Sequence, residues 1–113
     1  MYFRIVPLWA GFMLGLHLTQ ATAATSTGEN LARDSKCLAC HQVESRRVGP
    51  PFAAIAERFA GQPGATQYLA GVIQRGGRGQ WGAIPMPAQP HVNEAQAAAL
   101  AQWILSLSST EKP

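Results

Sequence analysis

Apolar residues recur with helical spacing in three stretches of the second half of the chain. The first stretch spans 52–60, where apolar positions fall at i, i+3, i+4 and i+7. The second spans 66–75 and ends at a pair of glycines, which readily stop a helix. The third follows Asn93 and runs to about Leu107, and Asn93 with Gln96 predicts a capping box. Each stretch therefore predicts one short amphipathic helix.

The segments before and between these stretches predict loops and one more helix. Asn30 is the predicted N-cap of a short helix that runs to Lys36. Residues 49–51 read Gly-Pro-Pro and residues 81–87 contain two prolines, so both segments are predicted to be irregular. No segment has the alternating pattern of a strand. The predicted fold class is all-α, with about four short helices in one domain.

The N-terminal segment has the organisation of a secretory signal. Residues 1–23 carry Arg4, then a mostly apolar run, and end in an Ala-Thr-Ala cleavage site at Ala23. Cleavage there leaves 24–113 as the mature domain and predicts export to the periplasm. A retained membrane anchor is the alternative, but the apolar run is short for a membrane span and is interrupted by Pro7, two glycines and a histidine.

Charge is nearly balanced along the chain. Nine Lys and Arg stand against six Asp and Glu, giving a formal net charge of +3. The clustered basic residues are two pairs or near-pairs, Arg46 with Arg47 and Arg75 with Arg78, which are too sparse for a nucleic-acid surface. This distribution favours a solvated rim that contacts a partner protein.

Residues 37–41 read Cys-Leu-Ala-Cys-His, a C-x-x-C-H motif typical of c-type haem attachment. Cys37 and Cys40 can each form a thioether to a haem vinyl group, and His41 can then bind the iron. A thioredoxin-like site would need a βαβ context, and a Cys37–Cys40 disulfide would close a very small loop. A zinc site would need Cys37, Cys40, His41 and His91, with two of its ligands adjacent in sequence.

Met86 is the candidate for the second axial ligand. It is the one methionine beyond the predicted signal, and Pro85 and Pro87 flank it. A lone methionine on a proline-stiffened loop is poorly suited to filling a core, whereas its thioether can bind iron and raise the reduction potential. His91 is the alternative ligand and would give a bis-His site of low potential.

Together the C-x-x-C-H motif, Val48-Gly49-Pro50, Trp81-Gly82 and Ile84-Pro85-Met86-Pro87 resemble the short single-haem class I cytochromes c of bacteria, the cytochrome c-five-fifty-one type. The resemblance implies the class I fold around one covalently attached haem, and electron transfer without enzymatic activity. It also implies that the Pro50 carbonyl accepts a hydrogen bond from His41, and that the Trp81 indole donates one to a haem propionate.

The resemblance further implies a monomeric periplasmic shuttle whose partners are periplasmic or membrane redox proteins. Nitrite reductase, a terminal oxidase and an upstream quinol-linked donor are compatible with it. The family often places a basic residue for a propionate where this chain has Val72, so either Arg75 or Arg78 substitutes for it or the propionate lacks that partner. Two other functions stay open at this point: a peroxidase or gas-binding protein with an open iron position, and a membrane-tethered subunit of a larger oxidase or reductase.

Overall fold

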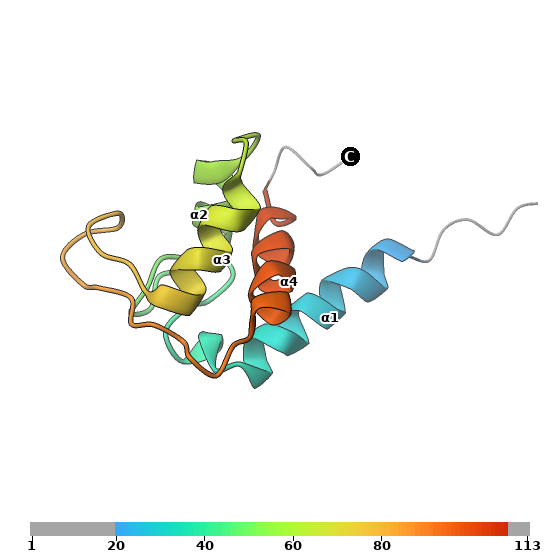
Figure 1. Ribbon diagram of the computed structural model, residues 1–113. Coiled ribbons are helices and arrows are strands. Elements are labelled where there is room, and N and C mark those ends of the chain that lie inside the picture. The colour runs from blue at the N-terminus through green and yellow to red at the C-terminus, as the bar shows by residue number, and fades with distance from the viewer. Residues whose placement is uncertain (1–19, 109–113) are drawn as a thin grey trace, which may run out of the picture.

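Four α-helices and one short 3-10 turn make up the fold in the computed structural model, which describes residues 20–108 (Figure 1). Between residues 20 and 108 the one β pairing is an isolated antiparallel bridge, so the predicted all-α class is confirmed. The elements in chain order are α1 (Gln20–Asp34), η1 (Cys37–Ala39), α2 (Phe52–Phe59), α3 (Ala65–Arg75) and α4 (Glu94–Leu105).

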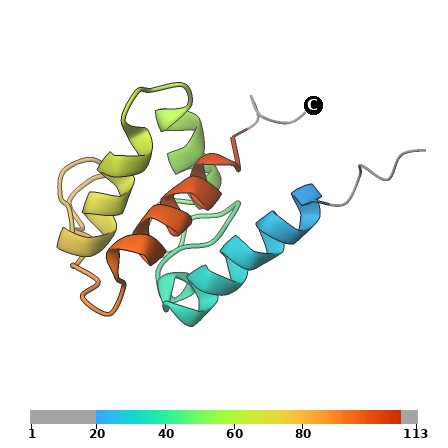
Figure 2. The same ribbon diagram turned by 45° about the vertical axis from the view of Figure 1, so that its right-hand side comes forward.

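Helix α4 is the centre of the packing. It contacts α1, α2 and α3, and both views show it between α1 and α3 (Figures 1 and 2). The approach to α1 is very close at Gly28, where a Cβ would lie 2.2 Å from Cγ of Trp103. Only a residue without a side chain fits there, because protein interiors are already close-packed.

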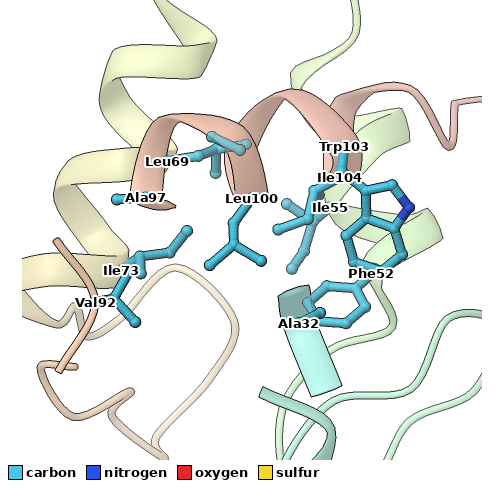
Figure 3. Packing of buried hydrophobic residues seen from close by; sticks show 11 residues of the cluster. Ala32, Phe52, Ile55, Leu69, Ile73, Val92, Ala97, Leu100, Trp103 and Ile104 are labelled. Atoms are coloured by element: carbon cyan, nitrogen blue, oxygen red, sulfur yellow. The ribbon is translucent and has the colours of Figure 1, made fainter. Parts of the chain in front are cut away.

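The core is small and rich in alanine (Figure 3). Leu100 of α4 is 1% exposed, and Phe52 of α2 packs edge-on against Trp103, with ring centroids 5.2 Å apart. Helix α3 adds Leu69 and Ile73. The predicted apolar faces of α2, α3 and α4 are therefore the buried faces, and their modest side chains bury little area for a domain of this length.

The predictions for α2 and α3 hold to within one residue at each end. The capping box at α4 is also confirmed. The Asn93 side chain accepts from the backbone N–H of Gln96 at 2.8 Å, and the Gln96 side chain accepts from the backbone N–H of Asn93 at 3.0 Å. Helix α4 ends at Leu105, slightly before the predicted Leu107.

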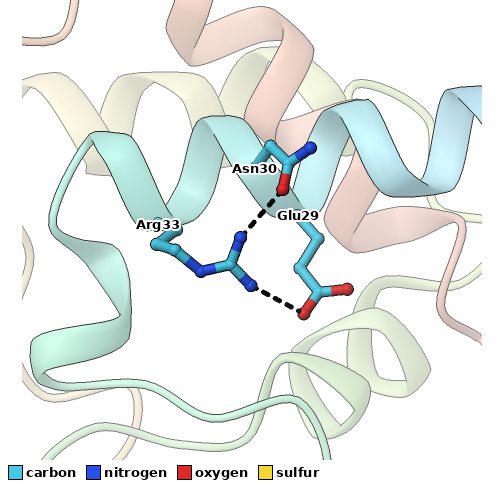
Figure 4. Close-up of polar contacts among 3 residues, drawn as sticks. All are labelled: Glu29, Asn30 and Arg33. Carbon is cyan, nitrogen blue, oxygen red and sulfur yellow. Dashed lines mark hydrogen bonds and ion pairs between the residues drawn. The ribbon is translucent and has the colours of Figure 1, made fainter.

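The prediction that Asn30 caps a helix is wrong. Helix α1 begins well before it, at Gln20, so Asn30 lies inside the helix. Its Oδ1 accepts from Arg33 Nη1 at 2.8 Å, while Arg33 Nη2 lies 3.5 Å from a carboxylate oxygen of Glu29 (Figure 4). These contacts join residues that are three and four positions apart, and such pairs on a helix surface stabilise the helical conformation of α1.

The predicted signal peptide, 1–23, lies almost wholly outside the described residues. Within 20–108, no helix has the length and apolar character needed to cross a membrane.

Candidate functional site

A cavity of about 460 Å³ opens beside α4. Its apolar wall includes Leu69 and Ile73 from α3 and Leu100 and Ile104 from α4, and the connection from α3 to α4 forms another side. The volume lies within the range of about 300–1,000 Å³ that is usual for ligand and cofactor pockets. We call this cavity the cleft.

Both cysteines line the cleft as free thiols. Lys36, in a left-handed conformation with φ of 66°, turns the chain from α1 into η1, which carries Cys37. Burial raises the pKa of the half-buried Cys37 thiol above its ordinary value, and a backbone hydrogen bond partly opposes this shift. Cys40 is exposed. The two cysteines, three positions apart in the sequence, therefore lie on the same cleft.

The His41 ring is held by contacts on several sides. Its Nδ1 lies 2.8 Å from the carbonyl oxygen of Pro50, the contact that the resemblance predicts. Because a carbonyl can only accept, Nδ1 carries the proton and Nε2 is left with a lone pair. The ring stacks on Phe52 at 4.9 Å between centroids, and a Cβ on Gly49 would lie 2.5 Å from its Cε1. His41 is therefore a buried, oriented imidazole on the cleft wall.

Met86 lines the same cleft from the connection between α3 and α4. Its backbone pairs with Gly77, with N···O distances of 2.8 and 3.0 Å in the two directions. Gly76 approaches this segment so closely that a Cβ there would lie 2.7 Å from the Met86 carbonyl oxygen. The backbone of Met86 is consequently fixed to the C-terminal end of α3.

Trp81 also lines the cleft, and Arg58 of α2 lies over its ring with the guanidinium carbon 4.7 Å from the ring centroid. Arg58 further donates to the backbone carbonyl of Gln80 and, at 3.2 Å, to its side-chain oxygen. Val72, Arg75 and Arg78 line the cleft as well. All the predicted site residues are thus present along one cavity.

His91 lies elsewhere. Its Nε2 is 2.8 Å from the carbonyl oxygen of Ser35, and His91 is not part of the cleft wall. Among residues 20–108, no group of three or more His, Cys, Asp and Glu side chains is placed to hold a metal ion. These observations disfavour both the zinc site and the bis-His site that the sequence left open.

Sequence reasoning missed several residues that shape the site. Phe52 belongs to the predicted apolar face of the 52–60 helix, and its stacking on His41 is not predicted by that pattern. Arg58 was not expected at all, because nothing local in its helix signals a contact with a loop 22 residues away. The sequence predicts an irregular segment at Gly49 and a helix end at Gly76, but not that Gly49 leaves space for His41 and Gly76 for the Met86 segment.

The side chains of the cleft fit a haem attached by thioethers. Such a group needs two thiols beside one another, a nitrogen ligand with a free lone pair and apolar walls for the ring. Cys37, Cys40 and His41 supply the donors from one side, and Met86 offers a thioether from a separate segment. The walls from α3 and α4 are apolar.

Comparisons with known proteins agree with this chemistry. The cytochrome c family matches residues 25–108. Cytochrome c-552 of Hydrogenobacter thermophilus is 48% identical over 83 residues, which cover 74% of this chain and 84% of that protein. Cytochrome c-551 of Pseudomonas aeruginosa is 44% identical over 78 residues, covering 69% of this chain and 74% of that protein.

The fold is similar to that of a solved relative. The crystal structure of wild-type Nitrosomonas europaea cytochrome c552 aligns with a TM-score of 0.69 at 49% identity, covering 70% of this chain and 98% of that one. The chain accordingly belongs to the cytochrome c family, as a class I electron carrier with one covalently attached c-type haem and no enzymatic activity of its own.

Proposed function

We propose that this protein is a soluble periplasmic shuttle for single electrons, with His41 and Met86 as the two axial ligands of its haem iron. The observation that carries the proposal is that these two side chains, far apart in sequence, line one cleft together with Cys37 and Cys40. When bound, the haem supplies a one-electron iron couple. A site with both axial positions filled by protein leaves no position for a substrate on the metal.

The cysteines and His41 form the attachment side of the site. Cys37 and Cys40 hold the cofactor through two thioethers, and His41 binds through Nε2. The hydrogen bond from His41 Nδ1 to the Pro50 carbonyl supports this role, because it sets the tautomer and the plane of the ring and raises the basicity of Nε2. The stacking on Phe52 restricts rotation of the same ring.

Met86 lines the cleft from a separate segment, the connection between α3 and α4. A thioether is a weak ligand, so it must be held in place in both oxidation states. The pairing of its backbone with Gly77 supports this role, since it positions the segment without any contribution from the metal. Sulfur ligation favours ferrous iron and raises the reduction potential relative to a second imidazole.

Trp81 is proposed to donate its indole N–H to a haem propionate at the part of the cleft wall formed by residues 79–81, which we call the cleft mouth. An N–H donor to a partly buried carboxylate makes a charge-assisted hydrogen bond, which is about twice as strong as a neutral one. The half-buried position of Trp81 on the cleft wall supports this role.

Absorption spectroscopy and extraction test the proposal. Protein purified after periplasmic expression should retain its haem through acid–acetone extraction, and its ferric form should have the weak far-red band of sulfur ligation. Mass spectrometry should find a mature chain that begins at residue 24. Rapid CO binding by the reduced protein would instead indicate an open iron position and a gas-binding function. Recovery of residues 1–23 in the mature protein would indicate a membrane-tethered subunit.

A further inference from the structure

The segment that carries Trp81 has little internal means of holding its shape. Gly79 and Gly82 flank Gln80 and Trp81, and both have positive φ, 80° and 109°. A Cβ at either glycine would meet no atom within 4 Å, so the backbone around them lies in open space. The pairing of Gly77 with Met86 closes the base of this segment but does not reach Trp81.

Arg58 holds the segment from outside. Its guanidinium donates through both terminal nitrogens to Gln80, one bond going to the backbone carbonyl and one to the side chain. The same group lies 4.7 Å above the Trp81 ring centroid. A planar guanidinium is suited to donate and stack at once, whereas an ammonium group has no flat face. Helix α2 is thereby connected to the cleft mouth by one side chain.

These contacts also place a full positive charge beside Trp81. The haem that the family carries has two carboxylates. A carboxylate that accepted from the Trp81 indole would be stabilised in its ionised form by the positive charge of Arg58 beside the ring. Removing the positive charge would leave a more negative surrounding for the iron and would favour its ferric form.

We propose that Arg58 is the positioning residue for Trp81, which fixes the 78–84 segment at the cleft mouth and supplies the cation for the haem carboxylate that Trp81 binds. This inference rests on the proposed function of the cleft. It gives α2 a share in a role that the sequence suggested for Arg75 or Arg78, both of which line the cleft. Arg75 instead folds back along α3, where its Nη2 lies 2.3 Å from the place a Cβ on Gly71 would take.

Three variants of the haem-loaded protein test the inference: Arg58→Gln, Arg58→Lys and, as the matched control for loss of one exposed arginine, Arg47→Gln. Neither arginine lines the cleft, but Arg58 of α2 contacts Gln80 and Trp81, whereas Arg47 lies in the loop between η1 and α2. Two quantities are measured at low ionic strength, where screening is weak. One is the midpoint potential, and the other is the exchange rate of the Trp81 indole proton followed by NMR.

Arg58→Gln should lower the midpoint potential, so that the ratio of reduced to oxidised protein against a fixed mediator falls about threefold or more. The indole proton should exchange faster as well. Arg58→Lys should have a midpoint potential close to that of the parent protein, because it keeps the positive charge. It should still accelerate exchange of the indole proton, because it loses the planar guanidinium that stacks on Trp81 and donates to Gln80. Arg47→Gln should change neither quantity.

If Arg58→Gln and Arg47→Gln have the same midpoint potential, the proposal that Arg58 supplies a cation for the haem carboxylate is wrong. Unchanged exchange of the indole proton in Arg58→Lys would contradict the proposal that Arg58 positions Trp81. This test also holds if Arg58→Gln fails to fold. Failure of the proposed function is recognised separately. In that case the parent protein itself would lack covalent haem or the far-red band, before any Arg58 variant is compared.

Discussion

Gly77 and Met86 exchange a pair of backbone hydrogen bonds, at 3.0 and 2.8 Å, in the one isolated bridge of the described chain. This bridge fastens the loop that presents the Met86 thioether to the end of α3. Gly76 precedes it and lets the two backbones approach, since its φ of 79° and its contact distances both exclude a side chain. The position of the Met86 segment thus depends on a glycine at position 76.

Substitution of Gly76 should disturb the Met86 loop more than backbone strain alone would. Gly76→Ala should lower the free energy of unfolding and weaken the far-red band, because its Cβ would lie 2.7 Å from the Met86 carbonyl oxygen. Gly79→Ala, with a φ of 80° and open space around it, is the comparison for positive φ without a close contact and should cost about 1–2 kcal/mol. Equal effects of both variants in chemical unfolding and absorption spectra would contradict this explanation.

Loss of the capping box should weaken the central helix. Asn93→Ala removes the side chain that accepts from the Gln96 N–H and should lower the free energy of unfolding by about 0.5–2 kcal/mol. Asn93→Ser keeps an N-cap oxygen and should stay close to the parent protein. Denaturant unfolding of the haem-loaded proteins measures both. A serine variant as unstable as the alanine variant would argue against capping as the cause.

The elements that could be predicted from sequence are those that local chemistry decides. The helices at 52–60 and 66–75 follow from apolar spacing, and the α4 start follows from Asn93 and Gln96. The start of α1 could not be predicted from Asn30, because the same side chain can cap a helix or pair with Arg33 along its surface. Local sequence does not distinguish these two arrangements.

The site was predictable where a motif or a resemblance carries the chemistry, and not where distant segments meet. The C-x-x-C-H motif and the isolated Met86 pointed to one cofactor, and both line the same cleft. The contact of Arg58 with Trp81, by contrast, joins a helix end to a glycine-flanked loop. Such a contact depends on the folded arrangement of α2 and the 78–84 segment, which periodicity does not encode.

Removal of the haem should unfold most of the chain. The helices α2, α3 and α4 have 8, 11 and 12 residues, lengths that are marginal without tertiary packing. Without the cofactor, the apolar cleft walls from α3 and α4 would lose the surface they pack against, in a domain whose whole stability is only about 5–15 kcal/mol.

The double variant Cys37→Ala/Cys40→Ala, produced without covalent haem, measures this dependence. Its far-UV circular dichroism should lose most of the helical signal of the parent. A single-cysteine variant that still attaches haem through one thioether should keep that signal and serves as the control. Helical content and cooperative unfolding equal to the parent in the double variant would contradict a structural role for the cofactor.

Charge at the cleft rim should affect the rate of encounter with an acidic-faced redox partner. Arg46, Arg75 and Arg78 line the cleft, whereas Arg47 does not. Arg78→Glu should slow bimolecular electron transfer at low salt, and the difference should fade as the Debye length falls to about 10 Å near 0.1 M salt. Arg47→Glu changes the net charge equally and should slow transfer less. If stopped-flow rates are the same for both variants at every ionic strength, Arg78 has no role in docking.

The ligation of iron by Met86 is tested most directly by the ferric absorption spectrum and midpoint potential of Met86→Ala. Ile84→Ala is the control from the same loop, because Ile84 also lines the cleft but is 61% exposed and has no atom that can bind iron. We expect Met86→Ala to lose the weak far-red band, to bind CO readily when reduced and to have a lower potential, since the thioether favours ferrous iron. Ile84→Ala should retain the band and the potential. A far-red band that persists in Met86→Ala would mean that another residue binds the iron.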